Sequence, residues 1–154
     1  MESYILMNKQ LVAMLDSEKN IISNLSNASA LLNETLDDIN WVGFYLYCEK
    51  ENALKLGPFQ GKVACTHIPI NKGVCGTAAY LKETILVEDV HKFEGHIACD
   101  AASNSEIVIP IIISDNVFGV LDVDSPVFSR FTQVDKKYLE EFVNIVKGAI
   151  INGI

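Results

Sequence analysis

Residues 106–124 read EIVIPIIISDNVFGVLDVD, and this stretch carries the clearest structural signal in the chain. Two runs rich in apolar residues, Glu106–Ile113 and Val117–Val123, flank Ser114-Asp115-Asn116. Runs of this kind are typical of strands, and Asp and Asn tolerate the left-handed backbone of tight turns. The stretch therefore predicts a β-hairpin.

Shorter strand-like segments precede the hairpin. Aromatic and β-branched residues predict a strand over residues 40–48, and short strands are expected over 53–56, 66–70 and 84–87. The first short strand is expected to end at Gly57-Pro58. A short helix, entered through a glycine, is predicted over Gly73–Leu81, whereas residues 88–104 have no regular pattern.

Helical periodicity marks both ends of the chain. Ser17 is expected to cap a helix that has Glu18 in its first turn, and Thr132 is expected to cap the last helix. The apolar residues at helical spacing are Ile21, Ile22, Leu25, Ala28, Leu32 and Leu36 in the N-terminal part, and Val134, Tyr138, Phe142, Ile145, Val146 and Ile150 in the last helix.

This order of elements predicts an α+β fold, with a central, mostly antiparallel sheet and helices packed mainly on one face. The length of 154 residues and the 49% apolar content fit a single domain with a real core. We expect N-terminal helices over about 1–38, the sheet and its loops over about 40–126, and a C-terminal helix over about 132–151.

Composition excludes several functional classes. The formal net charge of −8 disfavours binding to nucleic acid. No stretch approaches the roughly 20 apolar residues of a membrane helix, and the start lacks the pattern of a secretory signal. We therefore expect a soluble, cytoplasmic protein. Structural disulfides are rare in a reducing cytosol, so we expect its four cysteines to be inert core residues, metal ligands or reactive groups.

The four cysteines differ in their surroundings. Cys99 lies in an irregular segment beside His96 and Asp100, and a neighbouring imidazole favours the nucleophilic thiolate. Cys75 either gains a lowered pKa at the start of its helix or packs as a small hydrophobe. Cys65 is either a core residue or a partner thiol, and we interpret Cys48 as structural.

Zinc binding is a weaker alternative for the same thiols. Its possible ligands are Cys65, Cys75, Cys99, His67 and His96. Structural zinc sites favour short pairs of cysteines, and none is present. We therefore expect no metal site.

Acidic residues gather on the predicted hairpin. Asp122 and Asp124 are two positions apart on one strand and so share a face, while Glu106 opens the neighbouring strand. Three acids near a cysteine loop suit a ligand with an ammonium group, and crowding raises one pKa so that a proton stays available. The aromatic strand carries Trp41, Phe44, Tyr45 and Tyr47. Most of these are expected in the core, and one or two are candidates to wall an apolar pocket for a methyl group or thioether.

These residues together resemble a known family. The motifs are NWVGFY at 40–45, GHIACD at 95–100, DVDSP at 122–126, and three cysteines spaced by 10 and 24 residues, at positions 65, 75 and 99. The pattern resembles the free methionine-(R)-sulfoxide reductases, a catalytic branch of the GAF-domain fold, over roughly the whole chain.

The resemblance implies a role for each residue. Cys99 attacks the sulfoxide sulfur, and Cys65 condenses with the resulting sulfenic acid to give a Cys65–Cys99 disulfide, which thioredoxin reduces. Cys75 is an alternative nucleophile or a relay to the reductant. Glu106 hydrogen-bonds or protonates the sulfoxide oxygen. The remaining roles belong to Asp122 and Asp124, which hold the substrate, and to Trp41 and Tyr45, which enclose its methyl group.

The resemblance also implies the R epimer as substrate, no bound cofactor, and thioredoxin as the external reductant. A homodimer is expected, and the helical face with Ile21, Leu25 and Leu32 could form its interface. Three other functions stay open: a non-catalytic GAF-type sensor of a small ligand, a dimeric interaction protein, and a peroxidase-like thiol enzyme. The sensor is the main alternative, because fold does not fix function.

Overall fold

The predicted hairpin lies inside a six-stranded antiparallel sheet. The computed structural model describes residues 1–97, 99 and 101–153. Its sheet has the strand order β3-β2-β1-β6-β5-β4. The strands are β1 (Trp41–Cys48), β2 (Ala53–Gly61), β3 (His67–Pro69), β4 (Ile85–Val87), β5 (Ser105–Ile113) and β6 (Asn116–Ser125). This α+β arrangement confirms the predicted fold class.

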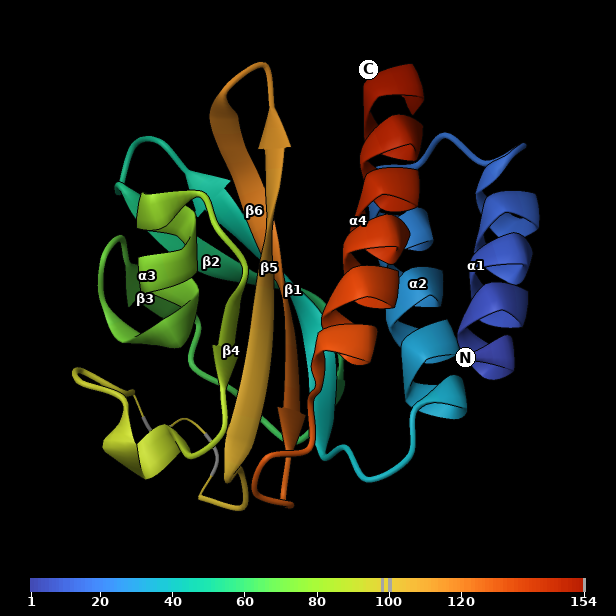
Figure 1. Ribbon diagram of the computed structural model, residues 1–154. Helices are drawn as coiled ribbons and strands as arrows, with labels where there is room; N and C mark the ends of the chain where they lie inside the picture. The colour runs from blue at the N-terminus through green and yellow to red at the C-terminus, as the bar shows by residue number, and fades with distance from the viewer. Residues whose placement is uncertain (98, 100, 154) are drawn as a thin grey trace.

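Helices cover the two faces of the sheet unequally (Figure 1). The helices α2 (Ile21–Thr35) and α4 (Gln133–Gly153) lie against one face, and α1 (Glu2–Leu15) packs on the outer side of these two. The opposite face carries the short helix α3 (Gly73–Leu81) and the 3₁₀ turn η1 (Val90–Lys92). Among the described residues, no helix combines the length and apolar character needed to cross a bilayer.

The alternation of side chains along β5 divides the core in two. Ile107, Ile109 and Ile111 pack with the three long helices. Val108 points to the other side, where it packs with α3. Successive residues of a strand face opposite sides, so Glu106 lies on the same face as Val108, toward α3. The fold thus places the acidic residues of the hairpin on the face that carries only the short helix.

The hairpin register brings acidic residues of both strands together. Glu106 pairs with Asp124, and Val108 pairs with Asp122. The connecting turn has two residues rather than the expected three, because Asn116 already belongs to β6. Ser114 and Asp115 both have positive φ angles, 51° and 66°, as a tight hairpin turn requires.

Strand β2 is longer than predicted. We expected it to end at Gly57-Pro58, but it continues to Gly61. Tyr45 pairs with Leu56 and Gly43 with Phe59, so Gly57 and Pro58 together oppose a single residue of β1. Such a bulge leaves one position unpaired and therefore tolerates a proline, which has no N–H to donate.

Three predictions for the helices are wrong in detail. The cap of α2 is Asn20, whose side chain accepts a hydrogen bond from the Ser23 N–H, and not Ser17, since the chain is still turning after α1 at that point. Ile22 and Val134 lie 59% and 45% exposed, on the outer sides of their helices. Leu25 and Leu32 are fully buried inside the chain, so they are not free to form a dimer interface.

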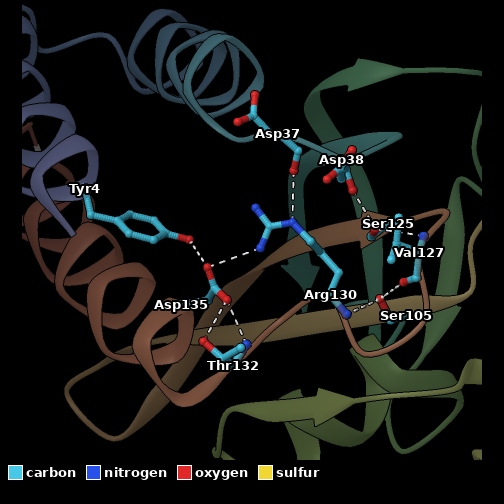
Figure 2. A network of polar contacts seen from close by, with 9 residues as sticks. All are labelled: Tyr4, Asp37, Asp38, Ser105, Ser125, Val127, Arg130, Thr132 and Asp135. Atoms are coloured by element: carbon cyan, nitrogen blue, oxygen red, sulfur yellow. Dashed lines mark hydrogen bonds and ion pairs between the residues drawn. The ribbon is translucent and has the colours of Figure 1, made fainter.

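A polar network fixes the start of α4 (Figure 2). The carboxylate of Asp135 accepts hydrogen bonds from the Thr132 N–H at 2.7 Å and from the hydroxyls of Thr132 and Tyr4. Arg130 lies 3.3 Å from the same carboxylate and donates through Nε to the Asp37 carbonyl oxygen. Thr132 thus precedes the helix as predicted, and the network links α4 to α1 and to the end of α2.

Two buried serines extend this network to the sheet (Figure 2). Ser105 and Ser125 face each other across β5 and β6. Ser105 donates to the Val127 carbonyl oxygen and accepts from the Arg130 N–H at 3.3 Å, while Ser125 donates to the Asp38 carbonyl oxygen. Each serine directly precedes or follows an acidic residue of the hairpin, so the network holds the strand ends that carry Glu106 and Asp124.

Candidate functional site

A small cavity of about 40 Å³ lies between α3 and the sheet. The lining includes most of the residues predicted to carry chemistry: Trp41, Tyr45, Cys75, Cys99, Glu106, Asp122 and Asp124. Cys65, the remaining member of that set, is joined by a disulfide to Cys99 of the lining. The fold therefore assembles residues from β1, α3, β5, β6 and the irregular segment before β5.

A disulfide joins Cys65 and Cys99. The S–S distance is 2.04 Å and the Cα atoms are 5.5 Å apart, which is ordinary disulfide geometry. Both cysteines are half-buried, and the carbonyl oxygen of Cys65 accepts a hydrogen bond from the Tyr45 hydroxyl at 3.0 Å. The pairing implied by the family resemblance is thus present, and it lies at the edge of the acidic cavity.

The carboxyl groups of the cavity are buried together. Glu106 and Asp122 are 7% and 5% exposed. Burial, and then the charge of Asp122, raises the pKa of Glu106 well above its ordinary value. Burial, and then the charge of Asp124, does the same to the pKa of Asp122. The site therefore favours the protonated form of these carboxyl groups, which makes a proton available to an acceptor in the cavity.

Cationic partners for these acids are missing from the described part of the lining. No lysine or arginine is present there. The Oδ1 atom of Asp122 is buried and has no hydrogen-bond partner among the described residues. A buried carboxylate without a partner is costly, so this cavity favours a ligand that brings its own positive charge.

The structure contradicts one of the two expectations for Cys75 and supports the other. It lies in the first turn of α3, but burial and then the charges of Asp122, Glu106 and Asp124 raise the pKa of its thiol. The expected lowering of the pKa by the helix start is therefore wrong, and the alternative, close packing, fits its 4% exposure. Its Sγ lies 4.0 Å from Oε2 of Glu106.

Among the described residues, the expected neighbours of Cys99 carry no positive charge that would activate its thiol. His96 lines the cavity, but partial burial, and then the charge of His91, lowers the pKa of its imidazole. The ring is therefore neutral at physiological pH. Asp100, the other expected neighbour of Cys99, and Ala98 of the same motif lie outside the described residues.

The aromatic wall is held from several sides. Trp41 stacks on Phe59 and Tyr45, with ring centroids 5.2 and 5.8 Å apart. The indole Nε1 of Trp41 donates to the Lys62 carbonyl oxygen at 3.1 Å. Burial, and then the charge of Asp122, raises the pKa of Tyr45, so its hydroxyl stays protonated. The two rings thus form a fixed apolar side of the cavity.

Several lining residues were not predicted from the sequence. Val63, Ala64, Ile97 and Ser103 belong to irregular segments, where side-chain periodicity gives no signal. Val63 is 90% exposed, which is unusual for a large apolar residue and is visible only in the structure. His67, considered as a zinc ligand, is exposed on β3 and lies 3.9 Å from Glu51 instead.

Comparisons with known proteins agree with this geometry. The model of the GAF domain family matches residues 26–150. The chain is 51% identical over 142 residues to the free methionine-R-sulfoxide reductase of Escherichia coli (strain K12), covering 92% of this chain and 85% of that protein.

Two solved structures are similar along nearly the whole chain. The fRMsr of Staphylococcus aureus in its reduced form is 54% identical with a TM-score of 0.92, covering 96% of this chain and 94% of that chain. The free methionine-R-sulfoxide reductase of Neisseria meningitidis, solved in complex with its substrate, is 38% identical with a TM-score of 0.95, covering 97% and 89%.

Proposed function

The chain belongs to the free methionine-R-sulfoxide reductases of the GAF-domain family, and from this premise we propose that it reduces free L-methionine (R)-sulfoxide to L-methionine with its own thiols. The observation that carries the proposal is the Cys65–Cys99 disulfide at the edge of a cavity lined by three acids. A disulfide in that place is the expected end state of one turnover.

The first step is an oxygen transfer at Cys99. The thiolate of Cys99 attacks the sulfoxide sulfur while a carboxyl group of the cavity protonates the sulfoxide oxygen, which makes the sulfur more electrophilic. The oxygen passes to Cys99 as a sulfenic acid, and methionine leaves. Glu106 is the proton donor in this proposal, because burial raises its pKa.

The second step regenerates the thiols. Cys65 attacks the sulfenic acid of Cys99, water leaves, and the disulfide forms. Thioredoxin then reduces this disulfide by thiol exchange, so no bound cofactor or metal takes part. Cys75 is buried with a raised pKa, which disfavours it as the nucleophile and leaves the relay role.

Selectivity for the free amino acid follows from charge. Asp122 and Asp124 would hold the substrate ammonium, and Trp41 and Tyr45 would enclose its methyl group. Methionine sulfoxide inside a polypeptide has an amide in place of the ammonium and would leave buried carboxylates unpaired, which makes rejection strong.

We propose that residues 1–154 form one catalytic domain and that the protein acts as a homodimer.

The test is a coupled assay with thioredoxin, thioredoxin reductase and NADPH. The substrates are the separated R and S epimers of free methionine sulfoxide, and the R epimer with both termini blocked. We expect NADPH oxidation with the free R epimer alone. A non-catalytic sensor would bind without consuming NADPH, and equal rates on the blocked substrate would refute the role of the acids.

A further inference from the structure

We propose that, in the disulfide form, Cys75, Glu106 and Asp122 make a binding site for a single thiophilic divalent cation of the Zn²⁺ class. The second part of the proposal rests on the function above: this cation and the substrate ammonium compete for the same acids. The site would then exist in two alternative states, one filled by an ion and one filled by substrate.

The positions of three ligand atoms carry the inference. One thiol sulfur and two carboxylate oxygens, from Cys75, Glu106 and Asp122, all lie within 4.8 Å of one another. The sulfur–oxygen distance from Cys75 to Glu106 is 4.0 Å. Zinc binds sulfur at about 2.3 Å and carboxylate oxygen at about 2.1 Å in a tetrahedral arrangement, so an ion would draw these atoms together by about 1 Å, within the reach of side-chain rotation.

An unpartnered atom points to a ligand in this place. Oδ1 of Asp122 is buried without a hydrogen-bond partner among the described residues, and its residue is only 5% exposed. The described lining supplies no lysine or arginine that could neutralise the acids. Asp122 hydrogen-bonds to Glu106, Asp124 and Cys75, but these groups bring no positive charge. Buried charges in proteins are paired with opposite charges or coordinate metals, so a cation suits this position.

The cavity leaves room for a fourth ligand beside the ion. It offers about 40 Å³ of space to the centre of a water molecule, and roughly 10–15 Å³ of such space is enough to hold one water. A cation with one bound water as its fourth ligand therefore fits between these side chains. Oxidation of Cys65 and Cys99 also removes both of these thiols as competing ligands.

The donor set selects the class of cation. A thiolate with carboxylates suits zinc and other thiophilic ions, whereas Mg²⁺ and Ca²⁺ prefer oxygen donors alone. Binding forms one metal–sulfur bond and two metal–oxygen bonds, releases to solvent the thiol proton and any proton held by the two carboxyl groups, and moves no electrons. Cys48, the other free thiol, lies at the end of β1 and outside the cavity lining, so it provides a matched control.

The first test uses Co²⁺ as a spectroscopic substitute for Zn²⁺ on the oxidised protein. We expect a near-ultraviolet sulfur-to-cobalt charge-transfer band that saturates at one ion per chain and is removed by Zn²⁺. Cys48→Ser should keep the band and Cys75→Ser should lose it. Asp122→Asn should keep the band but weaken binding at least about tenfold, since one charged ligand is lost.

Several results would overturn the metal site. They are the absence of a saturable band in the wild-type protein, persistence of the band in Cys75→Ser, or its loss in Cys48→Ser alone. A folded circular dichroism spectrum is required of each variant. If Cys75→Ser does not fold, the weakened affinity of Asp122→Asn carries the test, and unchanged affinity there would refute the site.

The second test separates this inference from the proposed function. The double variant Cys65→Ser/Cys99→Ser cannot turn over or close the disulfide, so both ligands can be titrated at equilibrium. We expect free methionine (R)-sulfoxide to displace Co²⁺ and reduce the band. Co²⁺ binding without displacement would contradict the shared site and the substrate assignment. Sulfoxide binding without any cobalt band would contradict the competition alone, because the metal site of the disulfide form is tested on the oxidised wild-type protein.

Discussion

At single residues of the cavity, burial has a larger effect on the pKa than the other local influences. The start of α3 should lower the pKa of Cys75, yet burial and three neighbouring carboxyl groups raise it. The sequence places Cys75 at that helix start but gives no measure of its depth. It does place Asp122 and Asp124 on one face, because that follows from strand alternation alone. The direction of these side chains and the raised pKa of the crowded acids were therefore predictable, whereas the burial that raises the pKa of Cys75 was not.

Asp122→Asn is the direct test of these buried charges. The folded-state pKa of Asp122 is raised, so its contribution to stability is present below its ordinary pKa of 3.8 and is lost as the pH rises through the folded-state value. The wild-type free energy of unfolding should thus decline toward pH 8, and the asparagine variant should be more stable there by about 1–2 kcal/mol. Urea unfolding at pH 5.5 and pH 8 measures this.

The matched control for this change is Asp16→Asn, because Asp16 is exposed at the end of α1. It should leave the pH dependence of unfolding unchanged. A wild-type protein that becomes more stable between pH 5.5 and pH 8, with no difference in Asp122→Asn, would show that the acids of the cavity do not carry the charge we assign to them.

Whole helices and strands were predictable where their signals are local. The bounds of α3 follow from Gly73 and from the apolar run to Leu81, and the hairpin follows from its two strands and turn. The extension of β2 past Pro58 was missed because the bulge that tolerates this proline depends on pairing with β1. The exposure of Ile22 and Val134 depends on which side each helix turns to its neighbours, which periodicity alone leaves open.

The polar network at the start of α4 contains Asp135, whose contribution to stability should change with pH in the opposite sense to that of Asp122. Burial by itself raises the pKa of Asp135, but hydrogen bonds from Tyr4 and Thr132 and the charge of Arg130 lower it overall. Its stabilising contribution is therefore present at neutral pH and fades as the pH falls below the ordinary value of 3.8. Asp135→Asn should lower the free energy of unfolding by about 1–3 kcal/mol at pH 7.

Thermal and urea unfolding at pH 7 measure this loss, and Asp37→Asn is its control. Arg130 binds only the backbone carbonyl of Asp37, so removing that side-chain charge should change stability by less than about 0.5 kcal/mol. Equal effects of the two variants would mean that the network does not stabilise α4 or the strand ends beside the cavity.

At the level of the whole molecule, the redox state and the ligand cavity are coupled. The disulfide joins the segment before β3 to the segment before β5, and Cys99 lines the cavity, so the bond restrains one wall of the site. A form whose wall is restrained should bind its ligand more weakly than a form whose wall can adjust to it. Reduction should therefore strengthen ligand binding.

Calorimetric titration with L-methionine, the product, measures this coupling without turnover. We expect binding to the reduced protein and at least about tenfold weaker binding to the oxidised protein, a difference of about 1.4 kcal/mol. Cys48→Ser should show the same contrast, because Cys48 lies outside the disulfide. Equal affinity in the two redox states would contradict the coupling.

A single turnover without an external reductant tests most directly whether Cys99 reduces the sulfoxide. The fully reduced protein is mixed with excess free L-methionine (R)-sulfoxide, and both the methionine formed and the disulfide made are quantified. We expect one methionine and one Cys65–Cys99 disulfide per chain in the wild type, methionine without that disulfide in Cys65→Ser, and neither in Cys99→Ser. Undiminished methionine formation by Cys99→Ser would refute Cys99 as the nucleophile.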